Sequence, residues 1–353
     1  MASTPEVIAV PAPAPDPRLE LRTAGVIGLG TALPEHVVTN AEVGGRLGVD
    51  ENWIVRRTGI HERRHADPAV RLVGLATEAG RAAIEDAGID PVEIDLIIVA
   101  TLSHELSTPN AAPLIAHALG ASRAGGFDLG CACTGFVAGL ATASAWIESG
   151  RAETALIIGA ELMSRYIDPD DRRTAALFGD GAGAVVVTAG ASGTIGPIVF
   201  GADGSCGEMI TSNPETGAII MDGHETFKQA VGRLTESSLE ACRVAGIGLG
   251  DIDLFVYHQA NGRITTAVGE RLGLDPDRVV DCIAGFGNTS AASIPLALGH
   301  ARGAGQLRPG MRVLLSAVGA GFTWGTVVVE WGQAGGERPT PPSDPQANGA
   351  VTG

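Results

Sequence analysis

The stretch AGIDPVEIDLIIVAT, residues 87–101, predicts the end of a helix, a turn and a buried strand. Gly88 suits a helix end, and the run IDLIIVAT is short, apolar and rich in β-branched residues. A similar stretch, AGIGLGDIDLFVYHQ, begins at Ala245, which is 158 residues after Ala87. The strand-like runs TALIIGAE and RVLLSAVG begin at Thr154 and Arg312, again 158 residues apart. Two segment pairs at one spacing predict an internal duplication.

Helices and strands alternate around this stretch. Residues 71–88 and 135–149 have helical apolar spacing, whereas residues 94–101 and 153–161 are strand-like. This alternation predicts parallel β-α units and an α/β fold. Helix–loop–strand units resemble one another in general, but the shared A-G-I, the shared I-D-L and the common spacing favour a true duplication. We therefore predict two similar halves, at residues 22–190 and 191–332.

Composition and charge narrow the function classes. The 353 residues carry 24 Lys and Arg against 40 Asp and Glu, a net charge of −16, which disfavours nucleic acid and anionic membranes as partners. Apolar residues make up 45% of the chain, enough for a large core. No apolar run approaches the length of a membrane span. The low-complexity segments 1–21 and 333–353 are predicted to be a disordered leader and tail.

The five cysteines do not form a disulfide or zinc pattern. Their number is odd, and no C-x-x-C pair occurs. We expect a reduced, cytoplasmic protein without a metal. One cysteine stands out: Cys133 lies in FDLGCACTGFVAGL (127–140), between an apolar strand and an apolar helix. The positive end of a helix dipole favours the thiolate, so Cys133 is a candidate nucleophile. A buried structural role better suits Cys242 and Cys282.

Two further side chains are candidates for carbonyl chemistry. His258 closes the apolar strand in DLFVYHQANGRI, and Asn288 lies in the glycine-flanked turn GFGNTSAAS. Taken singly, His258 could be a satisfied core histidine and Asn288 a helix cap. The duplication instead places both residues and Cys133 at strand ends or helix starts, where ligands of α/β sheets bind. Cys, His and Asn together supply a nucleophile and two hydrogen-bonding groups.

Two glycine clusters have different interpretations. GDGAGAVVV (179–187) resembles a dinucleotide-binding loop, but its glycines precede a strand, whereas that fingerprint requires a helix. We therefore expect no bound nucleotide cofactor there. GAGFTWG (319–325) follows a strand and allows a close backbone approach. It is either a tight turn or a loop that binds an oxyanion.

The motifs together resemble the β-ketoacyl-acyl-carrier-protein synthase III family. The resemblance covers about residues 22–332 and rests on CTGF at Cys133, HQAN at His258, GNTSAAS at Asn288, GFTWG, DENWIVRRTGIHERR (50–64) and DDRRTAALFGDGAGA (170–184). It implies the thiolase fold, with two pseudo-symmetric halves in five α-β-α-β-α layers, and a homodimer. Thiolases have a second cysteine that GAGFTWG lacks, elongating ketosynthases have two histidines, and chalcone-synthase-like enzymes lack the HQAN and GNTSAAS surroundings.

The resemblance also implies a reaction. Cys133 would take an acyl group from acyl-CoA, and malonyl-acyl carrier protein would then lose carbon dioxide and condense with it. His258 and Asn288 would stabilise the enolate, and the backbone N–H groups of Cys133 and Ala320 would bind the oxyanion. Ala320 replaces a glycine common in the family. Both CoA thioester and malonyl carrier protein are substrates, so no cofactor is expected.

Further positions match the family's substrate-binding motifs, and each could instead have a surface or capping role. The resemblance implies that Trp53 and Arg172 sandwich the adenine of CoA, that Arg57 lies near its phosphates, that Asn261 lies near the pantetheine arm and that Phe227 lies at the tunnel mouth. Carrier-protein docking would involve Lys228 and Arg263, with Glu270 and Arg271 beside them. Thr108 would border the acyl pocket across the dimer interface, where a bulky aromatic residue restricts the pocket to short chains.

Alternative functions remain open at this point. Thr108 and Glu270 depart from the family pattern and favour, slightly, a pathway-specific priming ketosynthase or acyltransferase of polyketide biosynthesis that takes a longer or branched acyl primer. A side chain such as Leu106 or Met209 could instead fill the space at Thr108. A non-catalytic partner subunit is a minor alternative, because such partners usually lose the nucleophile and this chain keeps Cys133.

Overall fold

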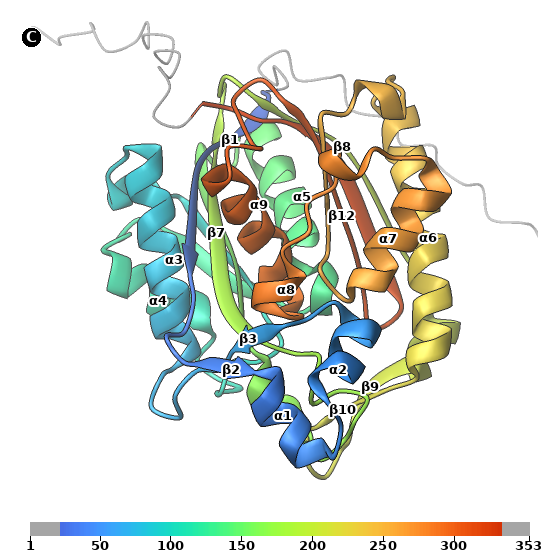
Figure 1. Ribbon diagram of the computed structural model, residues 1–353. Coiled ribbons are helices and arrows are strands. Elements are labelled where there is room, and N and C mark those ends of the chain that lie inside the picture. The colour runs from blue at the N-terminus through green and yellow to red at the C-terminus, as the bar shows by residue number, and fades with distance from the viewer. Residues whose placement is uncertain (1–21, 334–353) are drawn as a thin grey trace, which may run out of the picture.

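The structure is a computed structural model and describes residues 22–333 (Figure 1). The predicted leader and most of the predicted tail lie outside these residues. Gln333, which the prediction placed in the tail, donates its backbone N–H to the Ser192 hydroxyl at 2.9 Å. No helix within residues 22–333 is long and apolar enough to cross a membrane.

The first sheet has five strands in the order β1-β7-β6-β4-β5. The strands are β1 (Ala24–Ala32), β4 (Leu96–Ala100), β5 (Gly125–Leu129), β6 (Thr154–Leu162) and β7 (Asp180–Ala189). Strand β4 pairs in parallel with β5 and β6, whereas β7 runs antiparallel to both β1 and β6. The predicted strands at 94–101 and 153–161 are β4 and β6. The glycines of GDGAGAVVV begin β7, as expected for a strand and not for a nucleotide loop.

The second sheet repeats this plan with four strands in the order β11-β12-β13-β8. They are β8 (Thr194–Ala202), β11 (Leu254–Tyr257), β12 (Arg312–Gly319) and β13 (Thr323–Glu330). Here β11 pairs in parallel with β12, and β13 runs antiparallel to β12 and β8. Strand β11 follows β4, and β12 follows β6, at the spacing that the sequence repeat predicts. The predicted duplication is confirmed.

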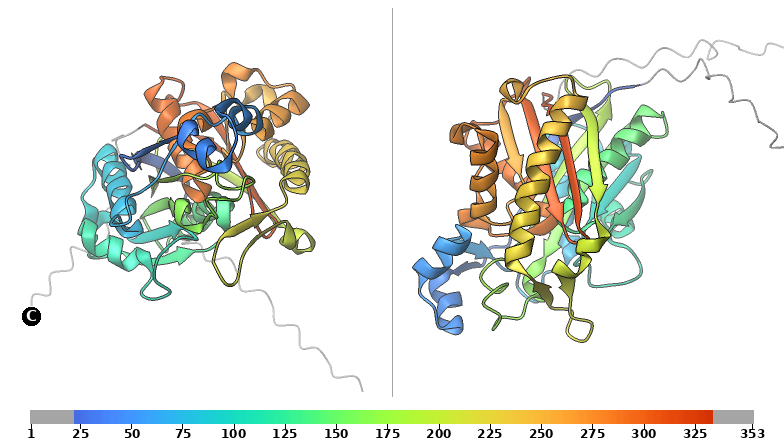
Figure 2. Two further views of the ribbon diagram at one scale, coloured as in Figure 1. Left: turned by 60° about the horizontal axis from the view of Figure 1, so that its bottom comes forward. Right: turned by 90° about the vertical axis from the view of Figure 1, so that its right-hand side faces the viewer.

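Helices form three layers around the two sheets (Figure 1). Helices α3 (Leu72–Ala87) and α4 (Ala111–Leu119) pack on the outer face of the first sheet. Helices α6 (Gly223–Val244) and α7 (Gly262–Leu272) cover the outer face of the second sheet, as Figure 2 also shows for α6. Between the sheets lie α5 (Gly135–Glu148) and α9 (Ser293–Gly303), whose starts are separated by the same repeat spacing. The five-layer α-β-α-β-α prediction is confirmed.

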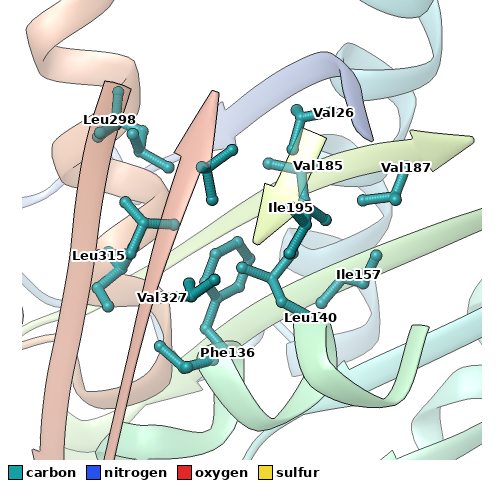
Figure 3. Packing of buried hydrophobic residues seen from close by; sticks show 14 of the residues in the cluster. Val26, Phe136, Leu140, Ile157, Val185, Val187, Ile195, Leu298, Leu315 and Val327 are labelled. Atoms are coloured by element: carbon teal, nitrogen blue, oxygen red, sulfur yellow. The ribbon is translucent and has the colours of Figure 1, made fainter. Parts of the chain in front are cut away.

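The central core explains why α5 is apolar on most of its circumference. A helix with a sheet on each side has no solvent-facing side. Phe136 and Leu140 of α5 pack against Ile157 and Val185 of the first sheet and Val327 of the second (Figure 3). Truncating a fully buried aromatic side chain such as that of Phe136 costs about 3–5 kcal/mol. The two halves therefore share one hydrophobic core.

Shorter elements gather at one end of the molecule, at the bottom of Figure 1. Two small helices, α1 and α2, stand beside the two-stranded sheet β2–β3 and the hairpin β9–β10. These elements are α1 (Asn40–Leu47), α2 (Glu51–Thr58), β2 (Val37–Thr39), β3 (Glu62–Arg64), β9 (Ile210–Ser212) and β10 (Ile219–Met221). The short helix α8 (Ile283–Phe286) lies above them in Figure 1. The 3₁₀ turns are η1 (Pro91–Glu93), η2 (Ala132–Thr134), η3 (Met163–Tyr166), η4 (Gly204–Met209), η5 (Leu249–Asp251), η6 (Pro276–Arg278) and η7 (Ser290–Ala292).

Candidate active site

A single cavity of about 830 Å³ brings the three candidate side chains together. Cys133, His258 and Asn288 all line it, although they come from both halves of the chain. Cys133 lies in η2, His258 follows β11, and Asn288 stands between α8 and η7. The convergence expected from the duplication is therefore present, and it occurs where the strands of the two sheets end.

The turn that carries Cys133 has a constrained backbone. Ala132, the residue before the nucleophile candidate, has φ 45°, a value that non-glycine residues adopt at a cost. Its counterpart in the second half, Ser290, has φ 49°. Such conformations persist only where the surrounding contacts determine them, and they concentrate at functional sites. The same unusual turn therefore occurs in both halves and begins both central helices.

The end of β12 packs directly against this turn. A Cβ added to Gly319 would come within 3.0 Å of the Cys133 backbone nitrogen and 2.8 Å of the Thr134 Oγ1. The hydroxyl of Thr134 also lies 2.6 Å from that of Thr323, the first residue of β13. Only glycine allows this approach, which brings Ala320 to the lining of the same cavity. The GAGFTWG motif is thus both a tight turn and a wall of the site.

The prediction that its position favours the Cys133 thiolate is corrected by the structure. Burial raises the pKa of the Cys133 thiol to about 12, because the desolvated sulfur loses the water that would stabilise its negative charge. The hydroxyl of Ser290 offsets part of this effect, and the charge of Glu161 adds to it. The resting side chain is therefore a neutral thiol. The sequence argument weighed the helix dipole but not the desolvation.

His258 is held in a neutral form. Its backbone N–H donates to the Ser316 carbonyl at 2.8 Å, and its side chain is almost fully buried. Burial lowers the pKa of its imidazole to about 3. The Nδ1 atom is buried and has no hydrogen-bond partner among residues 22–333. An unpaired acceptor costs less than an unpaired N–H, so the unpaired Nδ1 favours the tautomer that carries its proton on Nε2.

Asn288 is oriented by its own backbone turn. Its Oδ1 accepts a hydrogen bond from the Ser290 N–H at 2.9 Å, and its backbone pairs with both Leu177 and Gly179. Because the amide oxygen is occupied, the Nδ2 group is the part of the side chain left to donate into the cavity. The capping interpretation of Asn288 is not confirmed, because Thr289 and Ala292 occupy the cap positions of η7 and α9 and neither helix start has a side-chain cap.

The cavity mouth is basic although the protein is acidic. Among residues 22–333, no aspartate or glutamate lines the cavity, whereas four arginines do: Arg57, Arg172, Arg173 and Arg263. Trp53, Phe227 and Asn261 line it too. Helix α2 places Trp53 and Arg57 there, with Asp50 capping its start and Gly59 ending it. A cavity of this sign raises the local concentration of anionic ligands.

Several predicted mouth residues already have contacts. The Arg57 guanidinium lies 4.2 Å from the centre of the Trp53 ring, and that of Arg263 lies 5.4 Å from the centre of the Phe227 ring. Arg172 donates to the Leu47 carbonyl at 2.9 Å. Asn261 caps α7 through its Oδ1 and donates from Nδ2 to the Arg57 carbonyl. The capping alternative thus applies to Asn261.

Two predicted residues lie outside the cavity lining. Lys228 is exposed and lies 4.0 Å from Glu225. Thr108 is exposed in the loop between β4 and α4 and does not contribute to the lining within one chain. A single chain shows neither carrier-protein docking at Lys228 nor an acyl pocket that Thr108 would complete in a second copy. Both roles therefore stay predictions.

Sequence reasoning missed three features of the site. The β9–β10 hairpin covers the cavity with Ile210 and Ile219, but strands of three residues leave no clear period in a sequence. Arg173 is the second missed feature, because the sequence analysis selected only Arg172 from this pair of neighbouring arginines. Glu161 is fully buried at the end of β6 and accepts a hydrogen bond from the Ser290 hydroxyl. A lone acidic residue closing the apolar run TALIIGA was the signal for it.

No group of three or more His, Cys, Asp or Glu side chains positioned to hold a metal ion occurs within residues 22–333. The expectation that the protein needs no cofactor stays a prediction.

Comparisons with known proteins identify relatives along most of the chain. Residues 127–204 match the family model described as 3-oxoacyl-[acyl-carrier-protein] synthase III, and residues 242–331 match the model of its C-terminal part. A curated relative from Streptomyces coelicolor, beta-ketoacyl-[acyl-carrier-protein] synthase III 2, is 46% identical over 314 residues, which cover 88% of this chain and 94% of the relative.

Solved structures give the same result. A 3-oxoacyl-(acyl carrier protein) synthase III from Pseudomonas aeruginosa has a TM-score of 0.85 and 40% identity, covering 89% of this chain and 99% of its own. The priming beta-ketosynthase of a polyketide biosynthetic pathway has a TM-score of 0.84 and 38% identity, covering 89% of this chain and 98% of its own.

Proposed function

The chain belongs to the 3-oxoacyl-[acyl-carrier-protein] synthase III family, and from this premise we propose that it condenses an acyl-CoA primer with malonyl-acyl carrier protein through an acyl group carried on Cys133. It is an acyltransferase-type condensing enzyme. The observation that carries the proposal is the convergence of Cys133, His258 and Asn288 on one cavity with arginines at its mouth.

In the first half-reaction the Cys133 sulfur attacks the thioester carbonyl of acyl-CoA. The developing oxyanion accepts hydrogen bonds from the backbone N–H groups of Cys133 and Ala320, CoA leaves as the thiol, and an acyl-enzyme remains. The close packing of Gly319 on the Cys133 turn supports this pairing of N–H groups. Only the backbone of Ala320 is needed, so an alanine there serves as well as a glycine.

In the second half-reaction malonyl-acyl carrier protein loses carbon dioxide and forms an enolate. The Nε2–H of His258 and the Nδ2–H of Asn288 donate to the enolate oxygen, each as a fixed donor in a desolvated site. The low pKa of His258 supports this role, because the imidazole stays neutral and keeps a single defined donor at pH 7. The carbanion then attacks the acyl group on Cys133 and releases the β-ketoacyl carrier protein.

The mouth residues bind the substrate arms. Trp53 and Arg172 flank the adenine of CoA and Arg57 pairs with its phosphates, while Asn261 lies beside the pantetheine arm and Phe227 lies at the tunnel mouth. Four guanidinium groups without a lining carboxylate support phosphate recognition, because guanidinium forms strong charge-assisted bonds with phosphate. Lys228 and Arg263 contact an acidic carrier protein. Charge complementarity between the two proteins sets the association rate and the choice of partner.

We also propose that the enzyme acts as a homodimer in the cytoplasm. Within the described residues 22–333, strand β5 pairs with β4 alone, and a sheet edge of this kind favours pairing with another chain. The apolar residues Leu106 and Trp146 are 48% and 39% exposed in the single chain. A second copy would cover such apolar surface and bring Thr108 toward its partner's acyl pocket.

The test is turnover with defined substrates. Purified protein is incubated with acetyl-, isobutyryl-, hexanoyl- or dodecanoyl-CoA and malonyl-acyl carrier protein, and the carrier protein is weighed by mass spectrometry. The proposal expects a β-ketoacyl carrier protein that depends on both substrates. Acyl transfer to the carrier protein without loss of carbon dioxide would instead identify a simple acyltransferase.

A second candidate is the priming of a specialised pathway. The similarity to a priming beta-ketosynthase of polyketide biosynthesis favours it, as does the small side chain of Thr108 at the predicted pocket border. Preference for a longer or branched acyl-CoA in the same assay would support this candidate over acetyl priming.

A further inference from the structure

Glu161 is a fully buried carboxylate surrounded by hydrogen-bond donors. Its Oε2 accepts from the Ser103 hydroxyl at 2.5 Å, the Thr101 hydroxyl at 3.2 Å and the Leu102 N–H at 3.2 Å. Its Oε1 accepts from the Ser290 hydroxyl at 3.0 Å. Within the part of the chain that the structure describes, Glu161 forms no ion pair. A buried carboxylate without a cation is costly, so its place beside the active site needs an explanation.

Ser290 links Glu161 to the side chain of Asn288. The Ser290 hydroxyl donates to Glu161, and the Ser290 N–H donates to Oδ1 of Asn288 at 2.9 Å. Ser290 has φ 49°, a conformation that persists only where the surrounding contacts determine it. The bond from its hydroxyl to Glu161 is one such contact. Glu161 thus holds the turn whose N–H occupies the amide oxygen of Asn288.

The two halves hold their strained turns in different ways. Ala132, 158 residues before Ser290, has the equivalent conformation, φ 45°. At the same spacing, the residue of β12 that corresponds to Glu161 of β6 is Gly319. Gly319 packs closely against the backbone of the Cys133 turn. Each turn is therefore held by a strand end of the opposite half, by backbone packing in one case and by a carboxylate in the other.

The carboxylate is itself anchored to two strands of the first sheet. Thr101 and Leu102 directly follow β4, and Glu161 belongs to β6. The Ser103 hydroxyl, which donates to Glu161, also accepts the Leu162 N–H of β6 at 2.9 Å. The anchor is therefore part of the sheet and does not depend on a loop alone. A site residue that rests on such support keeps its geometry more precisely than one on an unsupported turn.

We propose that Glu161 is a positioning residue for the condensation step. Through Ser290 it fixes the Asn288 amide, so that Nδ2–H donates to the enolate oxygen. Glu161 is absent from the lining residues of the cavity within residues 22–333, so it acts through Asn288 and not on the substrate. No proton transfer is involved. This inference rests on the proposed function, because that function gives Asn288 its role.

The test measures acylation and condensation separately in Glu161→Ala. The variant leaves the sulfur of Cys133 in place, and the charge that it removes raises the pKa of the thiol, so acylation should be as fast as in wild type or faster. Condensation should be on the order of 100-fold slower, since a displacement of about 1 Å can cost that much. Glu161→Gln should restore most of this rate, because an amide still bonds to the Ser290 hydroxyl. Mass spectrometry of the intact enzyme and of the carrier protein gives both rates.

A double variant shows whether Glu161 acts through Asn288. In a protein that already carries Asn288→Ala, the change Glu161→Ala should slow condensation little further, because the group that Glu161 positions is gone. A general loss of stability would instead slow acylation as well, and its effect would add in full to that of Asn288→Ala. Either of these two results would overturn the positioning role.

Thr154→Val is the matched control on the same strand. It removes a buried side-chain hydrogen bond at the other end of β6, to the Thr188 hydroxyl at 3.1 Å, and should keep both wild-type rates. If Glu161→Ala does not fold, as circular dichroism would show, Ser290→Ala carries the test, with the same fall in the ratio of condensation to acylation. A wild-type ratio in the folded variant, or a Glu161→Gln as slow as Glu161→Ala, would overturn the proposal.

A measurement without substrate separates this inference from the proposed function. Hydrogen–deuterium exchange of the peptide that contains Ser290 should be faster in Glu161→Ala than in wild type, because the Ser290 N–H is held less firmly to Asn288. Unchanged exchange would overturn the positioning role. Faster exchange in the variant, together with no condensation by the wild-type enzyme with any acyl-CoA, would refute the proposed function alone.

Discussion

At the scale of single residues, the proposed mechanism assigns His258 and Asn288 to the second half-reaction and Cys133 to the first. In that mechanism Asn288→Ala removes a donor to the enolate but leaves the sulfur and the Ala320 N–H in place. We expect this variant to form the acyl-enzyme and to condense about 100- to 1,000-fold more slowly. Separate measurements of the single-turnover acylation rate and of the full turnover rate check that only condensation is slowed.

The double variant of His258 and Asn288 adds a further check. Residues that act as a unit are not additive, so replacing both by alanine should be little worse than the worse single change. Condensation by Asn288→Ala at the normal rate would remove Asn288 from the mechanism.

Buried His258 also makes stability depend on pH. Its folded pKa of about 3 lies below its ordinary value of 6.5, so the folded state binds fewer protons between these values. Its contribution to stability is complete above pH 6.5 and is lost as the pH falls. Between pH 7 and 5, wild type should lose roughly 2 kcal/mol more of its free energy of unfolding than His258→Asn. Urea unfolding at both pH values checks this, and equal losses would contradict it.

At the scale of elements, the contact between the end of β12 and the Cys133 turn would determine the geometry of the proposed oxyanion site. A methyl group in Gly319→Ala would lie 3.0 Å from the Cys133 nitrogen and push the turn away from Ala320. A displacement of about 1 Å can cost 100-fold in rate, so we expect a loss of kcat near that size.

Gly269→Ala in α7 is the matched control, because a Cβ there meets nothing within 4 Å. It should keep full activity. An equally active Gly319→Ala, with an unchanged thermal unfolding temperature, would show that the close approach is not needed.

The elements also show what local sequence can and cannot reveal. The strands β4, β6, β11 and β12 were predictable, because a strand between helical layers must be a short apolar run. The β9–β10 hairpin was not, because its strands have three residues each. The Cys133 turn was predicted as a helix start, but its thiol pKa was assigned the wrong direction. That pKa depends on burial by residues from both halves, which no local pattern records.

At the scale of the whole molecule, the duplication made the candidate site predictable. Once the repeat spacing is known, Cys133, His258 and Asn288 fall at the same end of two equivalent sheets. The link between Glu161 and Ser290 could not be found this way. These two residues are 129 positions apart in the chain and are joined by one side-chain hydrogen bond.

The proposed homodimer should also determine which acyl-CoA primer the enzyme prefers. Thr108 is exposed within one chain, so it can shape an acyl pocket only in a dimer. In Thr108→Phe we expect the ratio of specificity constants to shift from hexanoyl- toward acetyl-CoA, since each buried methylene contributes about 0.8 kcal/mol. Steady-state kinetics with both substrates checks this, with Ser107→Ala as a control that keeps the wild-type ratio. A wild-type preference for acetyl-CoA that Thr108→Phe leaves unchanged would contradict a wide pocket.

The central claim is that Cys133 carries the acyl group, and peptide mapping of the acylated protein tests it most directly. The protein is treated with acyl-CoA alone, digested and analysed by mass spectrometry. We expect one acyl adduct, on the peptide that contains Cys133, which disappears when malonyl-acyl carrier protein is added and never forms in Cys133→Ser. An adduct on another cysteine, or an adduct on Cys133 that persists in the presence of malonyl-acyl carrier protein, would contradict it.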